Sequence, residues 1–158
     1  MAGVLIHRTP VARDWIDYNG HLRDAYYGLI VSYATDALMD RLGMDAAYRQ
    51  RTHCTLYTLE SHTHYLRELK QADVVSVTVR LLAADHKRIH AAFDVLTEGQ
   101  PEPAACAESM LLHVHQGDKV AAQAFPEEIA ASITALLATT ASLPAAGPGS
   151  RRIELRSR

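Results

Sequence analysis

The segment Trp15-Ile16-Asp17-Tyr18-Asn19-Gly20-His21 carries a carboxylate and an imidazole four positions apart, with an Asn-Gly turn between them. The longest helical pattern of the chain follows directly. A helix N-terminus offers unpaired backbone N–H groups and the positive end of the helix dipole. A carboxylate held there can attack a carbonyl carbon, or direct water at it, while the N–H groups polarise the carbonyl oxygen. The segment therefore predicts acyl transfer or hydrolysis rather than redox or phosphoryl chemistry.

The overall composition limits the possible classes of function. The 158 residues, 48% hydrophobic and 22% charged, predict one globular domain. A net charge of −2 gives no basic excess for binding nucleic acid. Cys54 and Cys106 lie in apolar, strand-like segments, so we expect reduced core residues rather than a disulfide. No apolar leader and no run of about eighteen apolar residues is present, so we expect a cytoplasmic protein without membrane contact.

The central helix is expected over residues 21–42, with Asn19 as its N-cap and Gly43 as its stop. It carries two apolar stripes on opposite sides, one of Tyr27, Val31, Ala34, Leu38 and Leu42 and one of Leu22, Tyr26, Leu29, Tyr33 and Ala37. A helix with two apolar faces is expected to be buried on both, in the middle of the structure.

The rest of the chain is mostly strand-like. Alternating apolar and polar residues predict strands over residues 4–13, 52–66, 75–81, 88–97 and 104–116. A short polar helix or turn is expected over residues 45–51, and a weaker, alanine-rich helix over residues 126–139. We expect residues 1–140 to form the domain and residues 141–158 to be a loose tail.

This order predicts an α+β fold in which an antiparallel, five-stranded sheet curls around one long central helix, the hot-dog fold. The second helix face and the sheet edge would be exposed in a single chain. We therefore expect a homodimer formed through the sheet edge, with a homotetramer as a further step.

The element order, with Asp17-Tyr18-Asn19-Gly20-His21 entering the helix, resembles the hot-dog thioesterases of the 4-hydroxybenzoyl-CoA thioesterase-like group over about residues 4–117. One branch of that group is the thioesterase of bacterial carnitine degradation, which occurs alone or fused to L-carnitine dehydrogenase. Four stretches resemble this branch: residues 15–22, 33–38, 57–62 and 107–114. The resemblance implies hydrolysis of a small acyl-CoA thioester, betainyl-CoA to glycine betaine and coenzyme A, without metal or cofactor.

The resemblance also implies site residues. Asp17 occupies the position where many superfamily members place the catalytic carboxylate, and both a nucleophile and a base that activates water stay open. Gly20 and the backbone of His21 and Leu22 would supply the N–H groups that bind the oxyanion. The His21 side chain could orient Asp17 or the thioester, or lie on the helix surface. Asp17 could itself be no more than a turn or capping carboxylate.

Candidate substrate-binding residues lie nearby in the sequence or on the second strand. Aromatic rings and carboxylates recognise a quaternary ammonium, which has no hydrogen-bond donor. The alternative for the rings is ordinary core packing, for Asn19 a structural turn, and for the mid-strand Glu60 a solvated strand face. The candidates are Trp15, Tyr18, Asn19, Tyr26, Tyr57 and Glu60.

Two further patterns, paired histidines and basic residues at strand ends, could also bind ligands. The pairs His62/His64 and His113/His115 have a spacing that could place ligands for zinc on one strand face. We expect no metal, however, and an outer position for the second pair. Basic residues at strand ends could contact CoA phosphates or simply be solvated: Arg67, Lys70, Lys87 and Arg88.

The alternative functions are a thioesterase for another short-chain or aromatic acyl-CoA, and a protein that binds acyl-CoA without hydrolysis.

Overall fold

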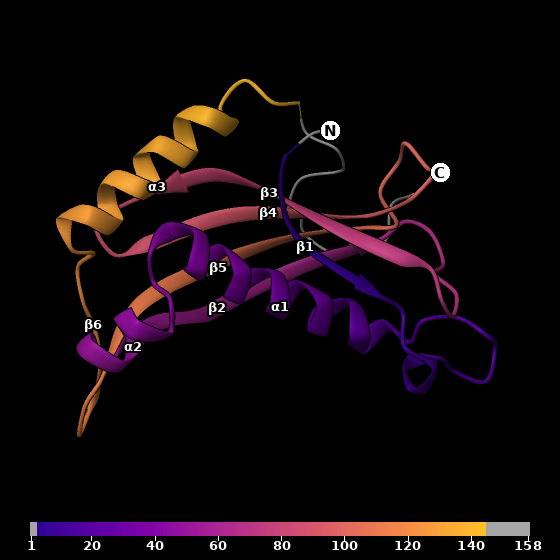
Figure 1. Cartoon of the computed structure of the whole chain (residues 1–158), viewed down its shortest axis with the longest axis horizontal. Coiled ribbons are helices and arrows are strands. Elements are labelled where there is room, and N and C mark those ends of the chain that lie inside the picture. Colours follow the sequence, from indigo (N-terminus) through magenta and orange to yellow (C-terminus); the bar gives the residue numbers. More distant parts are fainter. Residues whose placement is uncertain (1–2, 145–158) are drawn as a thin grey trace, which may run out of the picture.

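The computed structural model describes residues 3–144 and shows a curved antiparallel sheet with three α-helices (Figure 1). The elements in chain order are β1 (Val4–Pro10), the short 3-10 turn η1 (Arg13–Trp15), α1 (Asp24–Leu42), α2 (Ala46–Thr52), β2 (Cys54–Tyr65), β3 (Val74–Ala84), β4 (Arg88–Thr97), β5 (Ala105–Gln116), β6 (Val120–Ala122) and α3 (Glu127–Thr140). The loose tail expected over residues 141–158 lies, from residue 145 on, outside the described residues.

The sheet has the strand order β1-β3-β4-β5-β2, and β6 pairs with β5. All of these pairings are antiparallel. The five expected strands are therefore confirmed, and β1 and β2 form the edges. The sequence did not predict β6, because its three residues are all exposed and show no apolar alternation.

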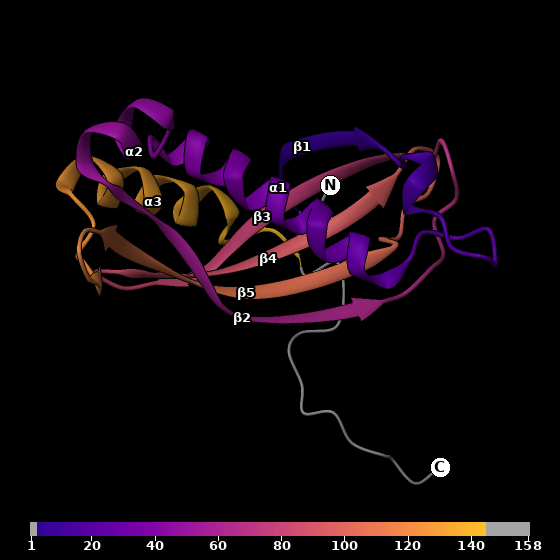
Figure 2. The same cartoon turned by 90° about the horizontal axis from the view of Figure 1, so that it is seen from below.

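The long helix α1 lies along one face of the curved sheet, with α3 beside it on the same face (Figure 2). Its first apolar stripe is buried as predicted and joins strand residues such as Val77 and Phe93 in one core. The second stripe is only partly buried in the single chain, where Leu22 is 5% exposed and Tyr33 is 42% exposed. One curved sheet covers one face of the helix, which leaves the second face accessible, as expected for a single chain. Burial of that second face in a dimer stays a prediction.

Helix α1 begins at Asp24, three residues later than predicted, and Arg23 rather than Asn19 is its N-cap. The delay has a tertiary cause. Ile16 and Leu22 form an antiparallel bridge, and the Leu22 N–H donates to the Leu69 carbonyl at 2.7 Å. This pairing keeps the chain extended up to Leu22. The predicted C-terminus is confirmed, since Gly43 follows α1 with a left-handed φ of 94° that glycine adopts without strain.

A curved antiparallel sheet that holds one long helix on its face is the hot-dog fold expected from the sequence. Both cysteines are buried and free, as predicted. Among the helices of the described residues, none has the length and apolar character needed to cross a lipid bilayer.

Candidate active site

Asp17 is fixed by a tight hairpin between Ile16 and Leu22. The Asp17 N–H donates to the His21 carbonyl at 2.9 Å, and the Gly20 N–H donates back to the Asp17 carbonyl at 3.1 Å. Gly20 has a φ of 80°, in the left-handed region that favours glycine. The Oδ1 atom of Asp17 accepts the N–H groups of Asn19 at 2.8 Å and His21 at 3.3 Å. The carboxylate is therefore oriented by its own loop.

These hydrogen bonds also set the charge of Asp17. Desolvation by neighbouring atoms raises its pKa, but the N–H donors of His21 and Asn19 outweigh that effect, so the pKa lies below its ordinary value. Asp17 is consequently ionised at neutral pH. An ionised, oriented carboxylate can act either as a nucleophile or as a general base.

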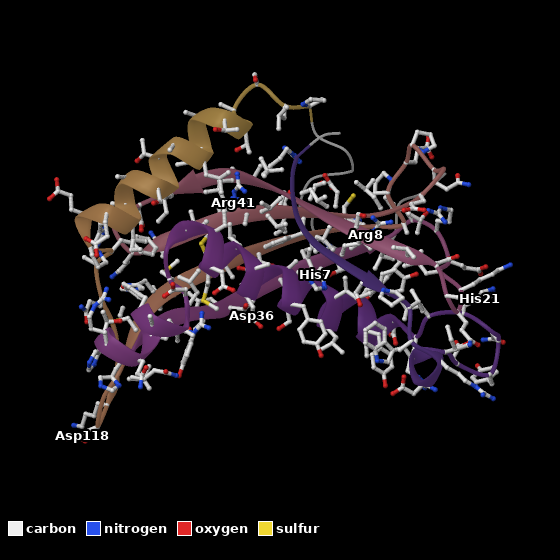
Figure 3. All side chains as sticks on the ribbon, in the orientation of Figure 1. His7, Arg8, His21, Asp36, Arg41 and Asp118 are labelled. Carbon is white, nitrogen blue, oxygen red and sulfur yellow. The ribbon has the colours of Figure 1, made fainter. Side chains whose placement is uncertain are left out.

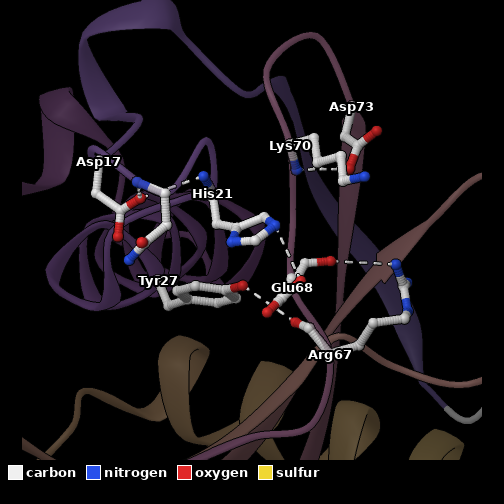
Figure 4. A network of polar contacts seen from close by, with 8 residues as sticks. Asp17, His21, Tyr27, Arg67, Glu68, Lys70 and Asp73 are labelled. Carbon is white, nitrogen blue, oxygen red and sulfur yellow. Dashed lines mark hydrogen bonds and ion pairs between the residues drawn. The ribbon is translucent and has the colours of Figure 1, made fainter.

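Asp17 borders a cleft of about 540 Å³, a size typical of small-molecule sites. The Asp17 hairpin, the first turn of α1 and the segment from the end of β2 into the following loop form its walls. Figure 4 shows the polar contacts of this region. The lining residues are Asp17, Asn19, His21, Leu22, Arg23, Asp24, Tyr27, Tyr65, Leu66, Arg67 and Glu68.

The imidazole of His21 points toward Glu68 rather than toward Asp17. Its Nε2 atom lies 3.0 Å from Oε2 of Glu68, whose side chain is 69% exposed (Figure 4). The hydrogen bonds between His21 and Asp17 use the His21 backbone. His21 therefore connects the Asp17 hairpin to the loop after β2, and Glu68 is a cleft residue that the sequence did not single out.

Two tyrosines that were not predicted as site residues also line the cleft. Tyr27 is 4% exposed, and its hydroxyl donates to the Arg67 carbonyl at 3.1 Å. Its ring meets that of Tyr65 edge-on, with centroids 5.3 Å apart and an interplanar angle of 82°. Burial raises the pKa of both tyrosines, so both hydroxyls are neutral. The sequence placed Tyr27 in the core stripe, and its contact with Arg67 spans 40 positions, which no local pattern could show.

The backbone N–H groups expected to bind an oxyanion already have partners inside the protein: Gly20 bonds to the Asp17 carbonyl, His21 to the Asp17 carboxylate and Leu22 to the Leu69 carbonyl. Within residues 20–26, all of which the structure describes, the N–H of Asp24 is the one that has no hydrogen-bond acceptor. It is the first residue of α1, at the positive end of the helix dipole. The available donor thus lies two residues after Leu22, the last of the three positions that the sequence indicated.

The other substrate-binding candidates lie outside this cleft in the single chain. Trp15 stacks on Tyr26 with centroids 5.4 Å apart, and both rings pack against the core. Tyr18 is 93% exposed. Tyr57 lies in the first half of β2, where its hydroxyl accepts a hydrogen bond from Gln116 at 3.0 Å. Glu60 borders a separate pocket of about 210 Å³ together with His62, His90, Glu108, Ser109 and Met110. Roles for these residues remain predictions.

The histidine pairs have structural contacts. His113 is fully buried, with Nε2 2.9 Å from the Tyr48 hydroxyl and Nδ1 2.9 Å from the Gln123 carbonyl. The prediction that His113 lies on the outer sheet face is wrong, because Tyr48 of α2 holds it in the interior. The rings of His62 and His64 stack with centroids 4.6 Å apart. Within residues 3–144, no group of three or more His, Cys, Asp or Glu is arranged to hold a metal.

Of the basic residues proposed to meet CoA phosphates, Arg67 lines the cleft. Its guanidinium donates to the Thr97 hydroxyl at 2.6 Å. Lys87 and Arg88 lie at the opposite end of the sheet, in and after the β3–β4 turn, where Arg88 pairs with Asp85 at 2.7 Å. A role for these two residues at the Asp17 cleft of the same chain is therefore excluded by distance along the strands.

Comparisons with known proteins agree with this geometry. Residues 11–133 match the family model of the thioesterase-like superfamily. The betainyl-CoA thioesterase of Pseudomonas aeruginosa is 42% identical over 138 residues, which span 87% of this chain and 86% of that protein. The L-carnitine dehydrogenase/betainyl-CoA thioesterase of Agrobacterium fabrum is 40% identical over 109 residues, 69% of this chain and 22% of that longer protein. A Staphylococcus aureus protein solved in complex with CoA superposes with a TM-score of 0.85 at 29% identity, over 99% of this chain and 98% of that one.

Proposed function

This chain belongs to the thioesterase-like superfamily and is an acyl-CoA thioesterase, and we propose that it hydrolyses betainyl-CoA to glycine betaine and coenzyme A. The similarity to the Pseudomonas aeruginosa enzyme extends over most of both chains. A second relative joins the same thioesterase name to L-carnitine dehydrogenase, which supports a place in carnitine catabolism. The observation that carries the proposal is the ionised, loop-oriented carboxylate of Asp17 in a cleft at the start of α1.

Asp17 drives the reaction by one of two routes. As a nucleophile, a carboxylate oxygen adds to the thioester carbonyl carbon, the C–S bond breaks, and CoA leaves as thiolate. Water then hydrolyses the resulting mixed anhydride and regenerates the carboxylate. As a base, Asp17 accepts a proton from water while the hydroxide adds to the carbonyl carbon, and the departing thiolate recovers that proton. Both routes consume one water and release one carboxylate, one thiol and one proton.

In both routes negative charge develops on the carbonyl oxygen. The unpaired N–H of Asp24, supported by the dipole of α1, is positioned to stabilise that charge. Tyr27 acts less directly: by donating to the Arg67 carbonyl, it holds the loop that carries Glu68 against the helix. Gly20 contributes by allowing the turn that aims Asp17.

The proposed unit is residues 1–140 working as a homodimer, with a homotetramer as a further step. The edge strand β2 supports this assembly because its middle exposes Tyr57 at 37% and Leu59 at 56%. The substrate-binding roles of Tyr57 and Glu60 depend on this dimer, which light scattering at several protein concentrations would test. A CoA thioester substrate also fits the expected cytoplasmic location.

The substrate proposal is tested by thiol release from a panel of betainyl-, acetyl-, butyryl- and benzoyl-CoA. We expect kcat/KM for betainyl-CoA to exceed that for acetyl-CoA at least tenfold. A higher value for an aromatic or longer acyl group would assign the chain to another thioesterase of the family. Tight binding of all four without thiol release would indicate a protein that binds acyl-CoA but does not hydrolyse it.

A further inference from the structure

The geometry of the betainyl group leads to a prediction about specificity that rests on the proposed function. In this acyl group, a single methylene separates the quaternary nitrogen from the thioester carbonyl carbon. When that carbon lies beside Asp17, the trimethylammonium group must lie in the same cleft. The cleft lining should therefore contain groups that attract a cation without hydrogen bonding, namely carboxylates and aromatic ring faces.

The lining contains both kinds of group. Besides Asp17, it carries the carboxylates of Asp24 and Glu68 and the rings of Tyr27 and Tyr65. Its basic side chains are His21, Arg23 and Arg67. Of these, Arg67 has its guanidinium held by two hydrogen bonds, to the Thr97 hydroxyl on β4 at 2.6 Å and to the backbone carbonyl of Glu68 at 3.5 Å.

Glu68 is the carboxylate best suited to meet the cation. Asp17 is needed for the chemistry, and Oδ1 of Asp24 accepts the N–H of Ala25 at 2.9 Å at the helix start. The carboxylate of Glu68 instead meets the imidazole of His21 at 3.0 Å. The Glu68 side chain is 69% exposed and lines the cleft, so its carboxylate can meet a bound ligand while it contacts His21.

The charge of Glu68 also acts on the neighbouring ring. Burial is the largest cause of the raised pKa of Tyr27, and the Glu68 carboxylate adds to it while Arg67 opposes it. In the same way, burial and then the charge of Asp24 raise the pKa of Tyr65. The two tyrosine rings, in edge-to-face contact, thus line the same cleft as the carboxylates of Asp24 and Glu68. This arrangement of rings and negative charge is the one that a quaternary ammonium prefers.

We propose that Glu68, together with the rings of Tyr27 and Tyr65, forms the subsite for the trimethylammonium group and sets the preference for a cationic acyl chain. Glu68 is a specificity-determining residue in this scheme, and Asp17 remains the catalytic one. Because the Glu68 side chain is 69% exposed, water screens the attraction, and we expect its removal to lower kcat/KM for the cation about five- to tenfold.

The test compares betainyl-CoA with 3,3-dimethylbutyryl-CoA, which has carbon in place of the quaternary nitrogen and nearly the same shape without the charge. Wild-type protein should prefer betainyl-CoA. Glu68→Gln should lose most of that preference through a lower kcat/KM for betainyl-CoA, while kcat/KM for the neutral thioester stays within about twofold. Tyr65→Phe should keep the preference, and Tyr65→Leu should reduce it several-fold.

Asp36→Asn is the matched control, because it removes one exposed carboxylate from α1 away from the cleft (Figure 3). It should change neither rate. The subsite is refuted if Glu68→Gln lowers both rates equally or leaves both unchanged while wild-type protein still prefers betainyl-CoA. If wild-type protein shows no preference for the cationic thioester, the proposed substrate fails first, before any variant is compared.

Discussion

Replacing Tyr27 by phenylalanine tests whether the hydroxyl of this buried ring holds the loop after β2 in place. The change removes one hydrogen bond, from the Tyr27 hydroxyl to the Arg67 carbonyl at 3.1 Å, and leaves the ring and its contact with Tyr65 intact. A hydrogen bond of this kind contributes about 1 kcal/mol net. The freed carbonyl borders an open cleft and can bond to water, so no further desolvation penalty is expected.

That magnitude predicts two measurable effects. A loss of about 1 kcal/mol lowers Tm by about 2–4 °C in a chain of this size. Since the same free energy corresponds to a factor of about five in an equilibrium, kcat/KM for betainyl-CoA should fall by no more than about fivefold. Thermal unfolding followed by circular dichroism and initial rates of thiol release measure both quantities.

Tyr33→Phe is the control, because Tyr33 lies on the exposed face of the same helix with 42% of its surface accessible. It should alter stability by less than about 0.5 kcal/mol and leave the rate unchanged. A loss of a hundredfold or more in Tyr27→Phe would refute a positioning role, since the hydroxyl would then take part in the chemistry. Unchanged Tm and unchanged kcat/KM would refute the loop-holding hydrogen bond itself.

Three further predictions concern the turn, the charge of the carboxylate and the buried histidine. Gly20→Ala should lower stability by about 1 kcal/mol, measured by thermal unfolding, through its positive φ alone, since an added Cβ meets no atom within 4 Å. The pKa of Asp17 lies below its ordinary value of 3.8, so its carboxylate stays charged between about pH 5 and pH 7. Protonation of Asp17 should therefore cause no loss of kcat/KM for acetyl-CoA in that range. A fall of activity with a midpoint in that range would contradict this assignment. His113→Phe should cost about 2–4 kcal/mol in urea unfolding, because it leaves the Tyr48 hydroxyl and the Gln123 carbonyl without their partner, yet the folded fraction should retain its rate.

The sequence predicted those features that depend on local periodicity. Alternation along β3 and β4 and the apolar stripe of α1 set the strands and the helix, because each buries a face whose spacing can be read directly. The Asn-Gly turn that orients Asp17 was equally readable, since Gly20 adopts without strain the positive φ of 80° that the turn has there.

The features that it missed depend on contacts between distant parts of the chain. The start of α1 was placed too early because the bond from Leu22 to Leu69 overrides the helical pattern. His113 was placed outside because its partner Tyr48 is 65 positions away. Tyr65 and Glu68 reach the cleft only because β2 runs back along α1 to the Asp17 hairpin, and no spacing within either segment indicates that meeting.

The most direct test of the whole account is the rate of CoA release from betainyl-CoA by Asp17→Asn. The substitution keeps the size of the side chain and removes its charge, and the exposed hairpin should leave the fold intact, as judged by circular dichroism. We predict a loss of at least about a hundredfold in kcat, as is typical when a catalytic acid–base group is removed. A folded Asp17→Asn protein that keeps most of the wild-type rate would contradict the claim that this carboxylate drives the hydrolysis.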